Sequence, residues 1–249
     1  MAQPGTRLKV CKDREALAVH AADMIVNTTA AAIRSRGKAM IALCGGRTPQ
    51  PAYALVAQSP RVNAIDWTRT FVFLTDERFV PSHHPENNFG MLQRTLLAPA
   101  GVDASHAFAV PTELATAQAA ATAYEATLAA AFAQSREYPP RFDLIVLGLG
   151  EDGHIASLFP GAAALDVRDR WVVASPPGSL APLVERVTLT LPVLNAARAI
   201  LLLAAGANKA AALRGALDER PGGNPPPAAR VHPADGKVTW LVDAAASGA

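Results

Sequence analysis

The sequence has almost no net charge, very few cysteines and no long apolar run. Its 249 residues include 23 Lys+Arg and 21 Asp+Glu, for a formal net charge of +2. This balance provides no broad positive field for nucleic acid or an anionic membrane, so we expect neither as a partner. Cys11 and Cys44 are too few for a disulfide framework. The apolar runs stay below the ~18 residues of a transmembrane helix, so none is expected.

The N-terminal segment also lacks the apolar stretch of a secretion signal, which makes the cytoplasm the expected location. Hydrophobic residues, in contrast, make up 50% of the chain, which is ample material for a core. The length suits one α/β domain better than two large domains. We therefore predict a single domain over residues 1–249, and the sequence leaves open whether it is a monomer or a small homo-oligomer.

Short apolar runs predict the strands, and longer segments between them predict helices. The runs do not alternate with polar residues, which is typical of strands that helices cover on both faces. The predicted strands are 40–43, 71–74, 144–147, 200–203 and 238–242. The predicted helices are 14–36, 51–58, 116–134 and 210–217. This order indicates an α/β fold with a mainly parallel sheet and helices on both faces.

Glycines and polar residues directly follow four of the predicted strands. In an open α/β sheet, ligands bind beyond the carboxyl ends of the strands, so four such loops could build one site. The first loop, Gly45-Gly46-Arg47-Thr48, suits a phosphate, because glycines allow close backbone approach and Thr48 adds a hydroxyl. An ordinary glycine turn into a helix explains it equally well. Lys209, at the predicted start of a helix, could reach the same anion, although a solvated lysine is the simpler interpretation.

The loop that begins at Gly148 matches the spacing G-x-G-x-x-G, but a nucleotide site is not favoured. Glu151 and Asp152 within the loop would repel a pyrophosphate, and no ribose-binding acid follows on a second strand at the usual distance. The same loop suits a catalytic turn better. His154 could take a proton from water near neutral pH, and Glu151 or Asp152 could orient its ring.

Two further charged residues, Asp76 and Arg78, follow the predicted strand 71–74. A carboxylate there could bind substrate hydroxyls, and a guanidinium could stabilise developing negative charge. A surface ion pair is the alternative. Ser157 does not stand in a G-x-S-x-G motif, so no nucleophile elbow is predicted. His83 and His84 lack metal-ligand spacing, and no metal site is predicted.

Four segments together resemble the family of 6-phosphogluconolactonases and glucosamine-6-phosphate isomerases. Their order and spacing match over nearly the whole chain, and the third, which ends in Ser-Leu-Phe-Pro-Gly, is the most specific. The segments are Gly45-Gly46-Arg47-Thr48-Pro49, Thr75-Asp76-Glu77-Arg78 with Glu86-Asn87-Asn88-Phe89-Gly90, residues 148–161, and Arg186-Val187-Thr188-Leu189-Thr190.

The resemblance implies a Rossmann-like fold, no required cofactor, and hydrolysis of the phosphorylated sugar lactone 6-phospho-D-glucono-1,5-lactone in the pentose phosphate pathway. It implies that His154 activates water, with Asp152 beside it, and that Asp76 and Arg78 bind and polarise the substrate. The residues it implies for substrate or phosphate binding are Gly45, Gly46, Arg47, Thr48, Lys209 and Arg186. Arg47 departs from the Ser of many relatives but still suits an anion.

Deaminases of the same family resemble this chain up to His154 and then read Phe-Asn-Glu-Pro. Phe159 stands here where they carry the glutamate that acts in ring opening, and a phenyl ring cannot move protons. This difference favours the lactonase. A sugar-phosphate deaminase or isomerase, and a non-catalytic sugar-phosphate sensor, remain the alternatives, although no basic helix-turn-helix pattern accompanies the latter.

Overall fold

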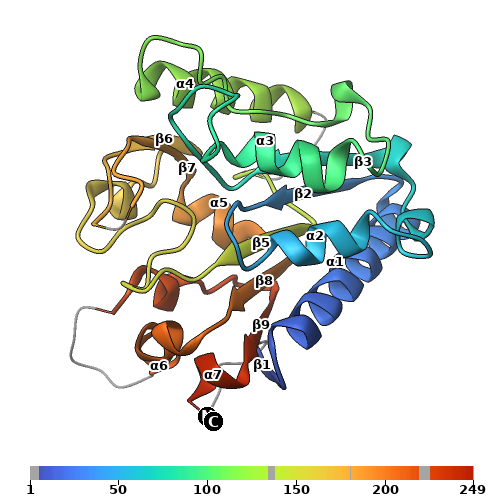
Figure 1. Cartoon of the computed structure of the whole chain (residues 1–249). Helices are drawn as coiled ribbons and strands as arrows, with labels where there is room; N and C mark the ends of the chain where they lie inside the picture. The colour runs from blue at the N-terminus through green and yellow to red at the C-terminus, as the bar shows by residue number, and fades with distance from the viewer. Residues whose placement is uncertain (1–5, 134–137, 180, 219–224, 249) are drawn as a thin grey trace.

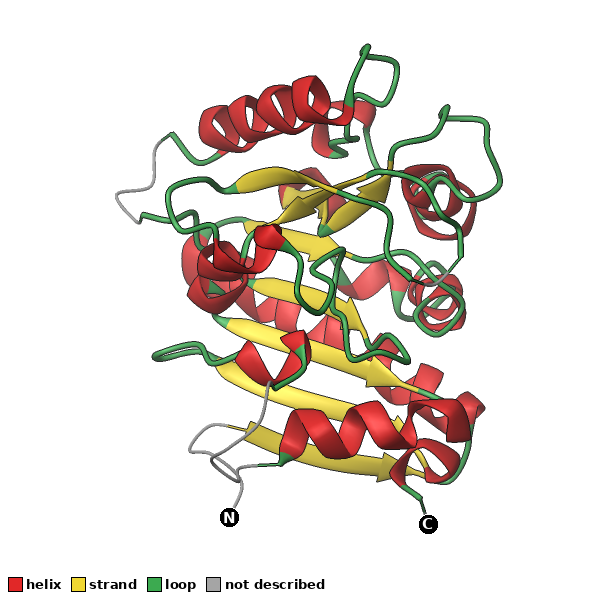
Figure 2. Cartoon of the chain, turned by 90° about the vertical axis from the view of Figure 1, so that its left-hand side faces the viewer, coloured by secondary structure: helices red, strands yellow, loops and turns green. Residues whose placement is uncertain are grey.

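The core of the computed structural model is a six-stranded sheet in which every pair of neighbouring strands is parallel. The model describes residues 6–133, 138–179, 181–218 and 225–248. The strand order is β1-β9-β8-β5-β2-β3, and Figure 2 shows helices in front of this sheet and behind it. The strands are β1 (Thr6–Cys11), β2 (Ala39–Leu43), β3 (Thr70–Leu74), β5 (Leu144–Gly148), β8 (Ala199–Ala204) and β9 (Lys237–Asp243).

All five strands predicted from apolar runs are confirmed, and β1 is the strand of this sheet that was missed. β1 pairs only with β9 and lies at the edge, where four of its six residues are exposed. An edge strand needs no continuous apolar run, so hydrophobicity alone gave no signal for it. The predicted α/β class, with a mainly parallel sheet, is confirmed.

A second, antiparallel sheet of three short strands was not predicted. Its order is β4-β7-β6, formed by β4 (Asp76–Arg78), β7 (Arg186–Leu189) and β6 (Val172–Ser175). The N–H of Leu189 donates to the carbonyl of Thr75 at 2.9 Å, which ties this small sheet to the end of β3. The segment after β3, which was expected to be a loop, therefore contains the strand β4. This strand pairs with β7, which lies more than 100 residues away in the sequence.

The helices cover the sheet in the arrangement of Figure 1. Those predicted at 14–36 and 210–217 have the predicted bounds, and those predicted at 51–58 and 116–134 are shorter than expected. The helices are α1 (Arg14–Arg36), α2 (Gln50–Val56), α3 (Asn88–Leu92), α4 (Ala117–Ala131), α5 (Leu191–Ala196), α6 (Ala210–Leu217) and α7 (Ala244–Ser247). Single turns lie at Val62–Ala64, Trp67–Arg69, Gln93–Leu97, Ala104–His106, Ala163–Asp166, Ala207–Lys209 and Pro227–Arg230.

Helix α1 corrects one expectation from the sequence. It is long and apolar enough to cross a membrane by length and composition, although no such segment was expected. Asp13 caps its start by accepting from the N–H of Ala16 at 2.8 Å, and Gly37 ends it in a left-handed conformation. One face of the helix, including Leu17 and Ile25, is buried in the core. A buried core helix satisfies the same criterion of length and composition as a membrane span.

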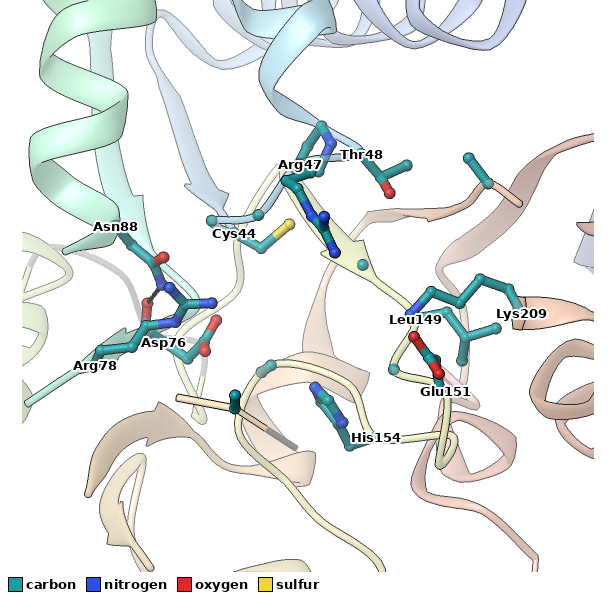
Figure 3. A pocket seen from close by; sticks show the side chains of 18 of the residues that line it. Cys44, Arg47, Thr48, Asp76, Arg78, Asn88, Leu149, Glu151, His154 and Lys209 are labelled. Atoms are coloured by element: carbon teal, nitrogen blue, oxygen red, sulfur yellow. Dashed lines mark hydrogen bonds between the residues drawn. The ribbon is translucent and has the colours of Figure 1, made fainter. Parts of the chain in front are cut away.

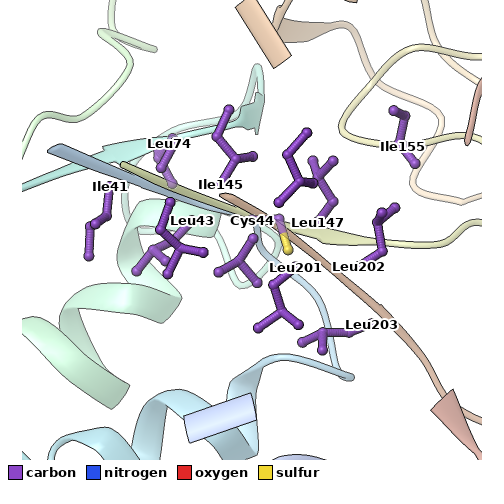
Figure 4. Packing of buried hydrophobic residues seen from close by; sticks show 14 of the residues in the cluster. Ile41, Leu43, Cys44, Leu74, Ile145, Leu147, Ile155, Leu201, Leu202 and Leu203 are labelled. Atoms are coloured by element: carbon purple, nitrogen blue, oxygen red, sulfur yellow. The ribbon is translucent and has the colours of Figure 1, made fainter. Parts of the chain in front are cut away.

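The hydrophobic core lies on the central strands β2, β5 and β8. Figure 4 shows Ile41, Leu43, Ile145 and Leu201 packed together, and none of these side chains is more than marginally accessible. Burying a side chain of this size stabilises a fold by roughly 1.5–3 kcal/mol. The three strands therefore form a well-packed support for the loops that follow their carboxyl ends.

Candidate active site

A cavity of about 590 Å³ lies at the carboxyl edge of the parallel sheet. Loops after β2, β3, β5 and β8 contribute to its walls, as the positions of the glycine and polar residues predicted (Figure 3). Nine of the ten predicted site residues line it, namely Gly45, Gly46, Arg47, Thr48, Asp76, Arg78, His154, Arg186 and Lys209. The tenth, Asp152, lies behind His154.

Two parts of the cavity differ in composition. We call Asp76, Arg78, Asp152, His154 and Arg186 the histidine end. We call Gly45, Gly46, Arg47, Thr48 and Lys209 the lysine end. Figure 3 shows Asp76 and Arg78 on the side of the cavity opposite Lys209, with His154 between them.

His154 is oriented by Asp152. Its Nδ1 lies 2.6 Å from Asp152 Oδ1, which also accepts from the backbone N–H of His154 at 3.1 Å. Burial raises the pKa of Asp152, but the hydrogen bonds and the charge of His154 outweigh this and hold it below its ordinary value. An ionised Asp152 keeps the proton of the neutral ring on Nδ1, which leaves Nε2 as an acceptor.

Glu151 takes no part in orienting the histidine. It accepts instead from Asn208 Nδ2 at 2.6 Å, at the lysine end. The choice between Glu151 and Asp152, which the sequence left open, thus falls to Asp152 in the structure. No helix begins within the loop 148–154, and the next strand, β6, is antiparallel and carries no acid. These features agree with the rejection of a dinucleotide site.

Asp76 is buried, and its carboxylate is held by two hydroxyls. Thr75 Oγ1 donates to its Oδ1 at 3.0 Å, and Ser157 Oγ donates to its Oδ2 at 2.7 Å. Asp76 does not pair with Arg78, so the ion pair considered from the sequence is absent. The buried Ser157 was set aside as a nucleophile, and its hydroxyl is instead a hydrogen-bond donor to Asp76.

Arg78 lines the cavity, and Glu86 holds one edge of its guanidinium. Its Nη1 donates to the carbonyl and to the carboxylate of Glu86, at 2.8 and 2.9 Å. Its Nε is buried and has no hydrogen-bond partner among the described residues.

Arg186 lies beside Arg78, because β4 and β7 place the two residues opposite each other. Burial and the charge of Arg78 lower its pKa below the usual range. Its guanidinium donates to the carbonyls of Pro182 and Val184, at 2.7 and 3.1 Å. The structure therefore places Arg186 beside Arg78 in the wall of the cavity, at the histidine end.

The side chain of Glu77 points away from the cavity and organises the wall behind it. It accepts from the backbone N–H groups of Arg78, Asn88 and Phe89 at 2.7–2.8 Å. Burial raises its pKa to about 7, although these three hydrogen bonds oppose the shift. Asn88 Nδ2 in turn donates to the carbonyl of Asp76 at 2.9 Å. Glu77 and Asn88 stand in segments that carried the family resemblance, but sequence reasoning gave neither a role. A side chain that binds backbone groups cannot be distinguished from a surface side chain by sequence alone.

The lysine end combines the glycine loop with two cations, Arg47 and Lys209, that have no ion-pair partner among the described residues. A Cβ on Gly45 would overlap the amide of Asn88, and Gly46 has a φ of 106°, so the loop requires glycine at both positions. Neither Arg47 nor Lys209 has a carboxylate within ion-pair distance in the described parts of the chain. Burial lowers the pKa of Lys209 and Arg47 adds to this, whereas Glu151 and Asp152 oppose it.

Several lining residues were not predicted. Phe159 packs against His154 with ring centroids 4.8 Å apart, and Cys44, Asn208 and Arg14 complete the walls. Cys44 is buried, and burial raises the pKa of its thiol to about 12, so the thiol is unreactive at neutral pH. No cluster of three His, Cys, Asp or Glu side chains within the described ranges could hold a metal ion.

The fold and the site together define an α/β protein with a cation-lined pocket and a histidine–aspartate pair at the carboxyl ends of its strands. Residues 12–240 match the family described as glucosamine-6-phosphate isomerases/6-phosphogluconolactonase, and the chain belongs to this family.

Similar proteins carry more specific names. The chain is 37% identical over 246 residues to a 6-phosphogluconolactonase of Streptomyces coelicolor, covering 97% of this chain and 93% of the relative. It is 35% identical over 240 residues to a 6-phosphogluconolactonase of Nostoc sp., covering 96% of each. The structure of 6-phosphogluconolactonase from Trypanosoma cruzi aligns with a TM-score of 0.88 at 30% identity, over 98% of this chain and 96% of that one.

Proposed function

We propose that this protein hydrolyses 6-phospho-D-glucono-1,5-lactone to 6-phospho-D-gluconate, a reaction of the pentose phosphate pathway. The observation that carries the proposal is the Asp152–His154 pair, which faces a cavity that also contains unpaired cations at its opposite end. A base and an anion site in one cavity suit a substrate with a reactive carbonyl and a remote phosphate. The names of the family members similar to this chain support the same substrate.

His154 is the proposed base. Its Nδ1 is engaged by Asp152, so Nε2 can take a proton from a water molecule as the water oxygen bonds to C1 of the lactone. The tetrahedral intermediate then collapses, the bond between C1 and the ring oxygen breaks, and the proton on Nε2 passes to that oxygen. The positive charge on the imidazole between these steps is stabilised by the carboxylate of Asp152.

Arg78 is proposed to stabilise the oxyanion on C1. Arg78 lines the cavity, and its hydrogen bonds to Glu86 fix the orientation of the guanidinium. A donor that is already oriented costs no reorganisation when charge develops in the transition state. Asp76, whose carboxylate is held by Thr75 and Ser157, is proposed to accept from hydroxyls of the sugar chain.

The lysine end is proposed to bind the phosphate. Arg47 and Lys209 supply charge, Thr48 supplies a hydroxyl, and the two glycines let the backbone come close. Because the phosphate is remote from C1, its binding energy orients the substrate without entering the chemistry.

A sugar-phosphate deaminase is less favoured by the site. The ring of Phe159 packs on His154, at the position where the deaminases carry a proton-transferring glutamate.

We propose in addition that residues 1–249 act as one domain, in the cytoplasm, as a monomer or small homo-oligomer.

The test is hydrolysis of freshly generated 6-phosphogluconolactone, compared with its spontaneous opening. Wild type should accelerate ring opening, and His154→Ala should lower kcat by roughly 10²- to 10⁴-fold, the usual contribution of a positioned base. His232→Ala, at an exposed histidine outside the cavity, is the matched control and should keep wild-type activity. If wild type does not accelerate the reaction, or if His154→Ala is as active as His232→Ala, the proposal fails.

A further inference from the structure

Arg14 lines the same cavity, although nothing in its sequence context marked it. It is the first residue of α1, and its side chain is 71% exposed. The wall to which it belongs also contains Arg47, Asn208 and Lys209. Arg14 is therefore a third cation beside Arg47 and Lys209 of the lysine end, and it comes from the N-terminal end of the chain.

The guanidinium of Arg14 lies over Gly206, the residue that begins the turn to Lys209. A Cβ on Gly206 would lie 2.7 Å from Arg14 Nη2, and Gly206 has a φ of 98°, so this position requires glycine. The buried Asp243 accepts from the N–H of Gly206 at 2.9 Å, and its Oδ2 lies 3.8 Å from Arg14 Nε. One carboxylate thus fixes the turn that carries Lys209 and also attracts the Nε edge of Arg14.

The charge of Arg14 is available to an anion in the cavity. A cation at the start of a 23-residue helix opposes the helix dipole. In the described part of the chain, the guanidinium donates no hydrogen bond, and its one ion pair is the long contact with Asp243. Glu151, which accepts from Asn208, adds a negative charge that a third cation would offset.

We propose that Arg14 is a further phosphate-binding residue, which contributes to the lysine end of the cavity from α1 and raises the preference for phosphorylated over unphosphorylated lactones. The inference rests on the proposed function, because that function identifies the anion as the phosphate of the lactone. Arg14 is a binding residue here and takes no part in bond making or breaking.

The experiment compares Arg14→Ala with Lys12→Ala. Lys12 is the matched control, since it is a neighbouring cation, is 81% exposed and does not line the cavity. Three quantities are measured: the Kd of inorganic phosphate by calorimetry, kcat and KM for 6-phosphogluconolactone, and kcat/KM for unphosphorylated D-glucono-1,5-lactone. Arg14→Lys tests whether charge alone suffices.

Arg14→Ala should weaken phosphate binding and raise KM for the phosphorylated lactone by roughly three- to fivefold, the range of an exposed ion pair. Its kcat, and its activity on the unphosphorylated lactone, should stay at wild-type values. Lys12→Ala should match wild type throughout, and Arg14→Lys should fall between wild type and Arg14→Ala. The loss should shrink at ~1 M salt, where the Debye length falls to ~3 Å.

Two results would overturn the inference. One is a phosphate Kd for Arg14→Ala equal to that of Lys12→Ala, and the other is an equal loss on the unphosphorylated lactone. The phosphate measurement does not depend on turnover. If wild type failed to hydrolyse the lactone, the proposed function would fall, while weaker phosphate binding by Arg14→Ala would still support the role of Arg14.

Discussion

At the histidine end of the cavity, hydrogen bonds of 2.6–3.0 Å hold the carboxylates of Asp76 and Asp152, whereas at the lysine end Arg47 and Lys209 have no carboxylate partner in the described parts of the chain. Proton transfer needs atoms fixed to within a fraction of an ångström. Attraction of a phosphate tolerates a looser geometry, because charge acts over a longer range. We therefore expect substitutions at the histidine end to lower kcat and those at the lysine end to raise KM.

The largest effect within this comparison is expected for Asp152→Asn. The amide can donate to Nδ1 of His154, which would move the ring proton to Nε2 and remove the base. We expect kcat to fall by roughly 10²-fold or more, as for other histidines held in the wrong tautomer. Glu151→Gln makes the same charge change in the same loop and should retain kcat. Equal losses in the two variants would show that the charge of the loop matters and the orientation of His154 does not.

Lys209→Ala should produce the opposite kinetic pattern. Loss of a charge-assisted contact to the phosphate should raise KM by roughly 10- to 100-fold and leave kcat nearly unchanged. The control is Lys237→Ala, an exposed lysine on β9 that does not line the cavity. Steady-state kinetics on phosphorylated and unphosphorylated lactones would decide the matter. If Lys209→Ala lowered kcat on both substrates, the expectation that the lysine end affects KM and the histidine end affects kcat would be wrong.

Ser157→Ala probes how strongly the histidine end depends on its supporting hydrogen bonds. The change removes the 2.7 Å bond from Ser157 Oγ to Asp76 and leaves Thr75 as the donor to that carboxylate. We expect kcat/KM to fall by roughly three- to tenfold, the net value of one hydrogen bond. Ser175→Ala is the matched control, since Ser175 is also buried but its hydroxyl has no partner among the described residues. A loss of the same size in both variants would contradict the role of Ser157.

The smallest effect on catalysis, but a clear one on stability, is expected for Glu77→Gln. Burial raises the pKa of Glu77 from its ordinary 4.5 to about 7. The folded state therefore binds its proton more tightly than the unfolded state, and the stability that this provides is lost as the pH rises through about 7.

Denaturant unfolding should be measured between pH 4.5 and about 7. The free energy of unfolding of wild type should fall over this range because of Glu77, and this contribution should be absent in Glu77→Gln. The exposed Glu113→Gln should keep the wild-type profile. The Gln variant should also be less stable by about 1–3 kcal/mol, because its amide cannot accept all three backbone N–H groups. An unchanged pH profile in Glu77→Gln would contradict the assignment.

Much of this protein could be predicted from its sequence, because the responsible signals are local. The apolar runs at β2, β5 and β8 predict buried strands without reference to any other segment, and the turns after them predict the edge at which a ligand binds. His154 could be predicted for the same reason, since its acid partner is two residues away. Phe159 and the long motif around it carried the family resemblance.

The rest was decided by contacts between segments far apart in the chain. Strand β4 forms only because β7 pairs with it, and this pairing, not the order of residues, sets Arg186 beside Arg78. Arg14 reaches the cavity because α1 begins next to the turn at Gly206, almost 200 residues later. Local patterns report on hydrogen bonding and burial within one element, whereas the position of a charged side chain in a site depends on how separate elements pack. For this reason the sequence alone could predict His154 and the glycine loop as site residues, and only the tertiary structure could show which cations border one cavity.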